Sequence, residues 1–490
     1  MEANSESRPA YRSLWVWLLL VWAASAADRA IAGPVFSYII SNNLPIIQGV
    51  ENPYAVSGLV VGSLFFAGYM LTQFPGGYLG DKYGYRTIIV ISTIWAALAT
   101  ILTGLMTALV GLVALRVITG LGEGMFYSND RSVIVEQTPE EKRSFGLGVV
   151  ITGLAIGITI ALVSTPFLID LGNLVLGANE AWRMPFFALG AVTLVIGIGI
   201  ITFFKRQRGA REFRPDYLAA LRELGKYSVV FFVVVMGAYL LARLLDLPEW
   251  VVAVAMAFVA LLLVGFVYRR MGEEIAPVLY NRDLLLIYIS AIAILWNLWF
   301  FSFWSVSIVS QAAPQASFLH AALTAALNAG AGILGFPVGG WIADYAKRKG
   351  WGRKVMLISF TVAEGLLTVA FGLYLINGGQ SLTVMGILLF FQAIFFFALQ
   401  PISQALTADL VATPALLGAA FGMWNLIGEM GAVLSPGISG ALRDATGEWH
   451  AAVMLNAGVI LASAVVLLFV REWKGSSAEE QPSEEAEATS

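Results

Sequence analysis

Two pairs of oppositely charged residues lie within long apolar segments of this 490-residue chain. Asp28 and Arg29 are adjacent in one segment, and Arg116 and Glu123 are seven positions apart in another. A seven-residue spacing places two side chains on one face of a helix, two turns apart. Two acids and two bases that meet in an apolar interior would form ion pairs. A carboxylate released from its arginine there binds a proton more readily, so this set is suited to proton exchange.

The alternative is a purely structural role, in which these four residues hold two helices together. Buried ion pairs are often retained without chemistry. A static interface within lipid would form at lower cost from small residues and weak polar contacts. Because ionisable residues are costly inside a bilayer, each is treated first as a functional candidate with a partner of opposite charge.

The elements that must position these residues are transmembrane helices. Hydrophobic residues make up 58% of the chain and charged residues 12%, whereas soluble proteins carry about 25% charged residues. Apolar runs of about 20 residues recur from Leu14 to Val470, and each is long enough to cross the hydrocarbon core of a bilayer. The sequence therefore predicts an all-α polytopic membrane protein embedded in a lipid bilayer.

Fourteen apolar runs follow one another as six, two and six. The expected parts are a cytoplasmic N-terminus (1–12), a six-helix domain (13–204), a cytoplasmic linker (205–227), a transmembrane hairpin (228–269), a second six-helix domain (270–471) and a disordered acidic tail (472–490). Within the linker, residues 217–227 read as a short surface helix. Lys and Arg gather on one side of this arrangement, which predicts cytoplasmic termini and insertion in the cell (inner) membrane. We expect the hairpin to support the bundle from its periphery.

Composition excludes several other classes of protein. The chain has no cysteine and two histidines, which excludes disulfides, thiolate metal sites and a histidine-rich metal site. The net charge of −3 gives no basis for nucleic-acid binding. The sequence has no recognisable phosphate-binding loop, so we expect neither an enzyme nor a cofactor, and energy from an ion gradient. It makes no prediction of oligomeric state.

An internal repeat relates the two six-helix domains. One copy runs from Phe74-Pro75 through Gly77 to Asp81 and Arg86, and the other from Phe336-Pro337 through Gly340 to Asp344 and Arg348. In both, a glycine precedes an aspartate by four residues at a cytoplasmic helix end, and basic residues follow. We expect this contact to open and close as the halves move. The predicted conformational gate consists of Gly77, Asp81, Arg86, Gly340, Asp344 and Arg348, with Asp130 as a partner of the first loop.

These paired loops resemble the signature of the major facilitator superfamily of transporters. The resemblance covers about residues 30–470 except the hairpin, and it implies two six-helix domains around a midplane site that opens alternately to each side. Asp28-Arg29-Ala30 and the segment 116–124 resemble the anion:cation symporters, which include sialin-type and sugar-acid transporters. That resemblance implies Asp28 and Glu123 as proton-coupling acids, and Arg29 and Arg116 as groups that bind or gate an anion. Spinster-type transporters share a similar arrangement.

Further candidates surround this set. Asn425, in Gly422-Met423-Trp424-Asn425, resembles a substrate-facing asparagine of the same family. Glu429 lies one helical turn beyond it and would repel an anion if it faced the same cavity. We expect Tyr38, Tyr69 and Gln73 to offer hydrogen bonds, although for each alone an ordinary interhelical contact is the simpler interpretation. Glu364 is expected to pack against a polar neighbour.

Two functions remain in view. The first is proton-coupled symport of a small organic anion, a sugar acid or carboxylate, by alternating access. The alternative is proton-coupled export of an amphipathic, lipid-like or drug-like compound, which the hairpin and the aromatic residues of segment 296–304 favour. The hairpin resembles that of fourteen-span antiporters and peptide transporters, but residues 148–168 lack the Gly-Pro-x-x-Gly-Gly run of drug antiporters. A sensor role would not require an intact acid–base set.

Overall fold

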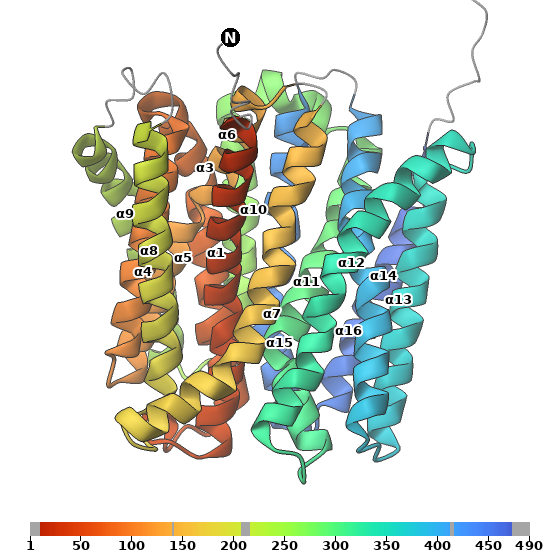
Figure 1. Ribbon diagram of the computed structural model, residues 1–490. Helices are drawn as coiled ribbons and strands as arrows, with labels where there is room; N and C mark the ends of the chain where they lie inside the picture. The colour runs from red at the N-terminus through yellow and green to blue at the C-terminus, as the bar shows by residue number, and fades with distance from the viewer. Residues whose placement is uncertain (1–9, 140–141, 207–215, 412–415, 473–490) are drawn as a thin grey trace, which may run out of the picture.

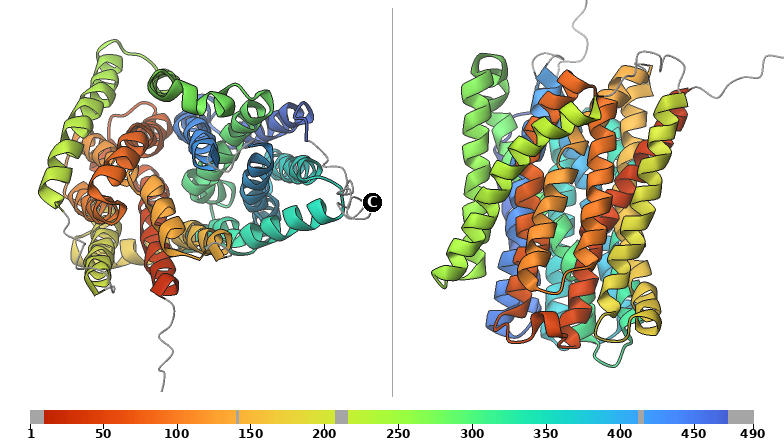
Figure 2. Two further views of the ribbon diagram at one scale, coloured as in Figure 1. Left: turned by 90° about the horizontal axis from the view of Figure 1, so that it is seen from above. Right: turned by 90° about the vertical axis from the view of Figure 1, so that its left-hand side faces the viewer.

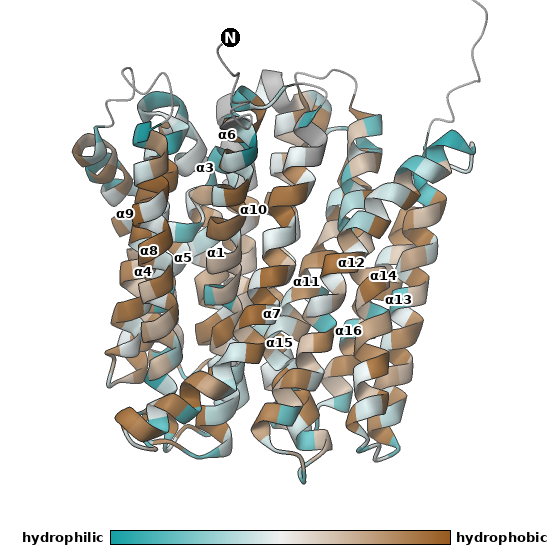
Figure 3. Ribbon diagram, viewed as in Figure 1, coloured by the Kyte–Doolittle hydropathy of each residue, from teal (hydrophilic) through white to brown (hydrophobic). Residues whose placement is uncertain are grey.

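The computed structural model describes residues 10–139, 142–206, 216–411 and 416–472, and this part of the chain consists of helices and their connections. Thirteen of its segments are long and apolar enough to cross a membrane. They run side by side as a bundle (Figure 1), with apolar residues along most of their length (Figure 3). Together with the 31-residue helix α10 (Glu249–Leu279), they agree with the fourteen predicted segments. The chain is an integral membrane protein.

The first half of the bundle contains the first six predicted segments. These are α1 (Ala10–Ser41), α2 (Pro53–Gly58) with the π turn η2 (Leu59–Ser63) and α3 (Leu64–Tyr83), α4 (Tyr85–Gly104), α5 (Leu109–Glu123) with α6 (Phe126–Gln137), α7 (Arg143–Val175) and α8 (Met184–Arg206). Short 3-10 turns, η1 (Pro45–Ile47) and η4 (Ala181–Arg183), lie in the connections. The fourth predicted segment is thus two helices, and Glu123 is the last residue of the first.

The second half contains the last six segments. These are α11 (Arg282–Ala312), α12 (Phe318–Arg348), α13 (Arg353–Ile376), α14 (Leu382–Leu410), α15 (Leu417–Thr446) and α16 (His450–Leu468). Seen from above, the red-to-orange helices of the first half and the teal-to-blue helices of the second lie on opposite sides of the molecule (Figure 2). Any site between the halves is therefore built from both ends of the sequence.

The inserted hairpin consists of α9 (Tyr217–Leu244) and α10. Asp216 caps α9 by accepting a hydrogen bond from the backbone N–H of Ala219 at 3.0 Å. The short helix expected over 217–227 is therefore continuous with the membrane helix, and α10 extends ten residues past the expected end of the hairpin at 269, to Leu279. The two helices separate: α9 packs on α3 and α5 of the first half, whereas α10 packs mainly on α15 of the second half and also contacts α2, η2 and α3 of the first.

Helices α3 and α15 face each other across the two halves in antiparallel directions. The side-chain amide of Asn425 donates to Oε1 of Gln73 at 3.1 Å. Toward the face opposite the N-terminus, the backbone N–H of Ala55 donates to Asp444 at 2.7 Å, and Arg443 lies over the ring of Tyr54. Because the two helices are antiparallel, residue numbers decrease along α3 in the direction in which they increase along α15. One helical turn from the contact of Gln73 with Asn425, Tyr69 on α3 therefore faces Glu429 on α15.

Candidate functional site

The four charged residues of the first half meet as two crossed ion pairs. Arg29 Nε lies 2.7 Å from Glu123 Oε2, and Arg116 Nη1 lies 3.0 Å from Asp28 Oδ2. Adjacent residues of α1 therefore bind partners two turns apart on α5. All four side chains are at most 3% exposed. The four residues singled out from the sequence are thus one buried cluster, in which each charge has an opposite partner.

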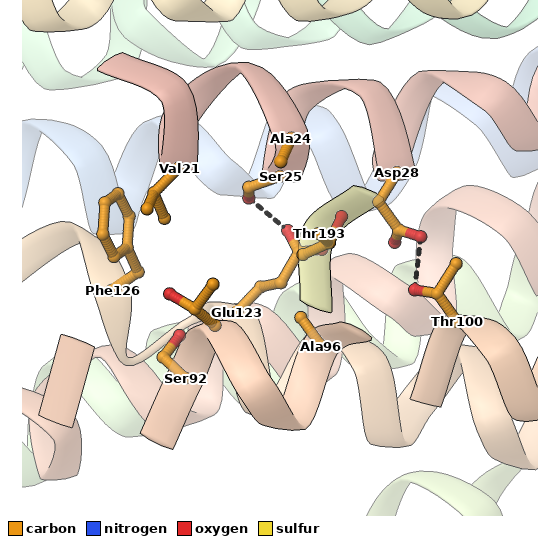
Figure 4. Close-up of a pocket in the computed structure, with 11 residues that line it drawn as sticks. Val21, Ala24, Ser25, Asp28, Ser92, Ala96, Thr100, Glu123, Phe126 and Thr193 are labelled. Carbon is orange, nitrogen blue, oxygen red and sulfur yellow. Dashed lines mark hydrogen bonds between the residues drawn. The ribbon is translucent and has the colours of Figure 1, made fainter. Parts of the chain in front are cut away.

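The two carboxylates differ in how completely they are satisfied. Asp28 accepts from Thr100 at 2.5 Å on one oxygen and from Arg116 on the other. Glu123 accepts from Arg29 on Oε2. The same oxygen accepts from Ser25 at 2.6 Å (Figure 4). Its other oxygen, Oε1, has no hydrogen-bond partner in the described part of the chain. Glu123 is therefore the acid with capacity for a further proton or hydrogen bond.

A small cavity lies beside both carboxylates. Its volume is about 10 Å³, and its polar lining comprises Asp28, Glu123, Ser25, Ser92, Thr93, Thr100 and Thr193 (Figure 4). A polar cavity of this size has room for about one water molecule. The space is therefore large enough for a proton carrier next to the acids, and too small for an organic substrate.

Aromatic rings surround the guanidinium of Arg29. Its Cζ lies 4.3 Å from the ring centre of Tyr69, 5.7 Å from that of Trp22 and 5.9 Å from that of Trp299. Trp299 belongs to α11, so Arg29 lies where the two halves meet. A cation held over aromatic faces away from water is stabilised by the ring electrons. Arg29 can therefore remain charged while it changes hydrogen-bond partners.

A C-terminal group of polar residues faces Arg29. Glu429 is 4% exposed, and its Oε2 has no hydrogen-bond partner among the described residues. It interacts electrostatically with both Arg29 and Tyr69. With the Gln73–Asn425 hydrogen bond one turn away, the structure brings Arg29, Tyr69, Gln73, Asn425 and Glu429 together at the junction of the halves.

Other predicted contributors lie elsewhere. The hydroxyl of Tyr38 contacts Asn173 of α7 at 3.4 Å, and its ring lies 6.0 Å from that of Phe318. The aromatic residues of α11 are buried: Trp296, Trp299, Phe300, Phe301, Phe303 and Trp304 are each at most 5% exposed. They are packing residues of the interior rather than a lipid-facing surface. Glu364, also buried, accepts from Thr368 of its own helix.

The first repeat loop contacts the inserted hairpin. Asp81 accepts from Tyr85 at 2.6 Å, while Lys82 and Tyr83 both donate to Oε2 of Glu223 on α9, at 2.7 and 2.6 Å. The hydrogen bond to this carboxylate raises the pKa of Lys82 above its ordinary value. Arg86 places its guanidinium over the ring of Phe204. Glu223 was not expected from the sequence, because its charge has no distinctive spacing.

Asp130 does not partner the first loop as expected. It is fully buried and accepts from Trp22 of α1 at 2.6 Å, with Arg131 Nε 3.6 Å away. Its neighbour Asn129 is the residue that contacts the repeat, since it donates to the backbone carbonyl of Gly76 at 2.9 Å. A helix turns by about 100° per residue, so a shift of one position redirects the contact from the loop to α1.

The second repeat loop is closed by Arg353 rather than by Arg348. Arg353 Nη2 lies 2.9 Å from Asp344 and Nη1 lies 2.5 Å from Asp409, which also binds Lys347 at 2.7 Å. Arg348 is exposed. Because Arg353 begins α13, its guanidinium reaches back to Asp344 near the end of α12.

The close-approach glycines of the repeat are one residue earlier than expected. A Cβ on Gly340 would meet nothing within 4 Å, whereas one on Gly339 would lie 2.5 Å from the carbonyl oxygen of Ala398. In the first copy, a Cβ on Gly76 would lie 2.7 Å from Cα of Met125, and one on Gly77 would contact a serine side chain at 3.3 Å. In each repeat, the glycine that packs closely against another helix lies just after the Phe-Pro pair. The prediction counted four residues back from the aspartate and so placed this glycine one position too late.

Ser25 and Thr100 are site residues that the sequence analysis missed. Ser25 lies one turn before Arg29 on α1 and bonds both that residue and Glu123. The four-residue spacing between Ser25 and Arg29, which places both on one face of a helix, could have identified Ser25 from the sequence. Thr100 lies on α4, and nothing local connects it to Asp28. Among the described residues, no group of three or more His, Cys, Asp and Glu could hold a metal ion.

Comparison with known proteins decides the family. A model of the Major Facilitator Superfamily matches residues 18–349 and 284–489. The chain belongs to this superfamily. Membership of the Major Facilitator Superfamily confirms the predicted fold and makes the chain a transporter rather than an enzyme.

Relatives and structural neighbours narrow the context. The chain is 23% identical over 450 residues to the D-galactonate transporter of Escherichia coli O6:H1, covering 90% of this chain and 94% of the relative. It is 23% identical over 444 residues to the hexuronate transporter of Bacillus subtilis, covering 89% and 90%. A bacterial homologue of the human lysosomal transporter Spinster, solved inward-facing and occupied, has a TM-score of 0.60 at 16% identity, covering 95% and 96%. At that identity the likeness concerns the fold alone.

Proposed function

We propose that the chain is a proton-coupled symporter of a small organic anion, a sugar acid or another carboxylate. Its relatives include transporters named for D-galactonate and hexuronate, both sugar acids. We further propose that the domains 13–204 and 270–471 alternate around the site, in the cell (inner) membrane with both termini cytoplasmic. The observation that carries the proposal is the Arg29–Glu123 pair, with one carboxylate oxygen unpartnered.

In this proposal, anion binding is coupled to proton uptake because the anion and Glu123 compete for Arg29. An anion that binds the guanidinium of Arg29 competes with the carboxylate of Glu123. Glu123 then loses its cation in a buried site, where an unpaired negative charge is costly, and it takes up a proton instead. Asp28 acts in the same way with Arg116 when the halves move. Anion and protons therefore bind and leave together, and more than one proton per monoanion carries net positive charge.

The remaining residues would select and hold the substrate. The guanidinium of Arg29 matches a carboxylate with paired, charge-assisted hydrogen bonds. Tyr69, Gln73 and Asn425 would bind the hydroxyl groups of a sugar acid, replacing the hydrogen bond that joins Gln73 to Asn425 in the present state. That bond links the two halves directly. Its replacement by substrate would therefore connect binding to their relative movement.

The loop contacts at the N-terminal face would act as the gate. We propose that Asp344 with Arg353, and the Asp81 loop with α9, hold one conformation and separate in the other. Gly77 and Arg86 belong to this gate through the first repeat, where a Cβ on Gly77 would contact Ser128 and Arg86 lies over the ring of Phe204. In this scheme Asp130 steadies α1 through Trp22 and does not bind the loop.

The test is current across proteoliposome membranes, with D-galactonate, D-glucuronate and short carboxylates added in turn. Wild type is expected to give a current with at least one anion, larger when the side of addition is acidic. Glu123→Gln is expected to lose the current while still binding the anion, because the neutral amide releases Arg29 but carries no proton. Glu364→Gln is the matched control, since it neutralises a buried glutamate elsewhere in the bundle and should keep the current.

Absence of current across the whole panel, in protein shown to be folded, would reject anion symport. Transport of an amphipathic compound would then be the function to test. The observation that favours this second function is the aromatic group at the junction of the halves, where the rings of Phe66 and Trp299 lie 4.6 Å apart. Its test is proton-driven efflux of an amphipathic dye from the same vesicles.

A further inference from the structure

The central cluster contains more acids than bases. Asp28, Glu123 and Glu429 face two guanidiniums, those of Arg29 and Arg116. With all five groups ionised, the cluster would carry one net negative charge in a buried site. An uncompensated buried charge is costly, so one acid holds a proton in the conformation described.

Glu429 is the acid whose charged form has the least support. Asp28 has hydrogen bonds to both oxygens and an ion pair, and Glu123 has an ion pair and a serine hydroxyl. Glu429 forms no ion pair among the described residues: its hydrogen-bonding neighbour is the uncharged Asn425, and its Oε2 has no partner there. Its surroundings come from both halves. The titratable and charged described groups facing it are Arg29 on α1, Tyr69 on α3 and Tyr127 on α6.

The position of Glu429 makes this proton relevant to an anion. It lies opposite Tyr69 in the antiparallel contact of α3 with α15, and Arg29 stacks on that same ring. An ionised Glu429 would place a negative charge beside any carboxylate bound to Arg29. A neutral carboxyl at the same place would instead donate a hydrogen bond to that carboxylate.

We propose that Glu429 is a third proton-binding acid of the site and that its protonation admits one negative charge at Arg29, so that the substrate is a monocarboxylate. When the anion binds, before the halves move, Glu123 and Glu429 are both protonated and Asp28 is still paired with Arg116, so the charges of Asp28 and Arg116 cancel and Arg29 leaves one positive charge. A monoanion neutralises that charge, whereas a dicarboxylate leaves the buried site negative. This inference rests on the proposed function, since it assigns the substrate class of the same site.

The test measures D-galactonate affinity from acid to alkaline pH in the Glu123→Gln background. Each proton that must be bound with the anion costs tenfold in affinity per pH unit above its titration. Glu123→Gln is expected to retain a tenfold loss per unit, and Glu123→Gln/Glu429→Gln to lose this dependence. Glu123→Gln/Glu364→Gln is the matched control and should keep it. A pH-independent affinity in Glu123→Gln alone would overturn the proposal.

Two further readouts separate this inference from the anion proposal. Galactarate, the dicarboxylate with the same carbon skeleton, is expected to bind at least about tenfold more weakly than D-galactonate, because the second charge is unmatched. Equal binding would overturn the substrate class. Infrared difference spectra of the substrate-free protein at neutral pH should show a protonated carboxyl band that Glu429→Gln removes. Its absence from wild type would overturn the protonation of Glu429 whether or not any sugar acid binds.

Discussion

The two halves of the molecule hold their buried acids in different ways. In the first half, Asp28 and Glu123 each bind an arginine, at 3.0 and 2.7 Å. In the second half, Glu364 and Glu429 are also buried, yet neither forms an ion pair in the described part of the chain. A buried carboxylate without a cation is stable mainly in its neutral form. The comparison teaches that the first half pairs each of its buried acids with an arginine, whereas the second half leaves its buried acids without an ion-pair partner among the described residues.

Removing one partner of a first-half pair should have the largest effect. Asp28→Asn leaves Arg116 buried without its carboxylate, and breaking a buried pair in this way costs about 3–5 kcal/mol. Glu364→Gln in the second half removes no ion pair and should change the free energy of unfolding by less than about 1 kcal/mol. Both values are measured by reversible unfolding in detergent micelles.

The double variant Asp28→Asn/Arg116→Gln provides the control for this prediction. It removes both charges, so part of the lost stability should return through a favourable coupling between the two substitutions. Equal losses for Asp28→Asn and Glu364→Gln would contradict the difference between the halves.

An intermediate effect is expected from removal of the aromatic ring of Tyr69, which lies against the guanidinium of Arg29. Tyr69→Leu removes a cation–π contact worth about 2 kcal/mol in a desolvated site, so D-galactonate should bind at least about tenfold more weakly. Tyr69→Phe keeps the ring and should stay within about threefold of wild type. Titration calorimetry gives both affinities.

The matched variant is Phe65→Leu, which removes the ring 4.6 Å from Cζ of Arg116. Arg116 lies inside the first half, so this change should affect stability more than affinity. A larger loss of affinity from Phe65→Leu than from Tyr69→Leu would move the anion from Arg29 to Arg116.

The smallest effect concerns the two repeat loops. Glu223→Gln weakens the exposed contact of Lys82 with α9, and exposed ion pairs contribute little, so the initial uptake rate should change by less than about twofold. Arg353→Gln should have the larger effect, because it leaves Asp344 and Asp409 without the guanidinium that joins them. Uptake rates in proteoliposomes rank the two variants, and the reverse order would show that the first loop controls the gate.

The sequence predicted the transmembrane helices and the charged residues of the central cluster better than it predicted which side chains those residues contact. Span length and hydropathy depend on local composition, so the bundle followed from the chain alone. Asp28, Arg29, Arg116 and Glu123 stood out because charge is rare in apolar segments. Their crossed pairing, Thr100 and Glu223 depend on how distant helices are rotated against one another, which no local pattern encodes.

Errors of a single position had the same origin. Gly339 rather than Gly340, and Asn129 rather than Asp130, make the contacts expected of their neighbours. Spacing places a residue on a helix to within one position, whereas a contact requires a specific direction. Arg353 was overlooked as the partner of Asp344 because the intervening turn brings the start of the next helix back toward it.

The inserted hairpin has a mechanical consequence. Its first helix packs on the first half of the transporter, and its second packs mainly on α15 of the second half while also contacting α2, η2 and α3 of the first. The two helices are joined by a short turn in which Asp246 adopts a left-handed backbone conformation, with φ of 51°. In the proposed transport cycle, α9 would move with the first half, whereas α10, which contacts both halves, would have to shift against one of them. The hairpin therefore joins the two halves along one side of the bundle, so any change in their separation there must be taken up by the contacts of α10.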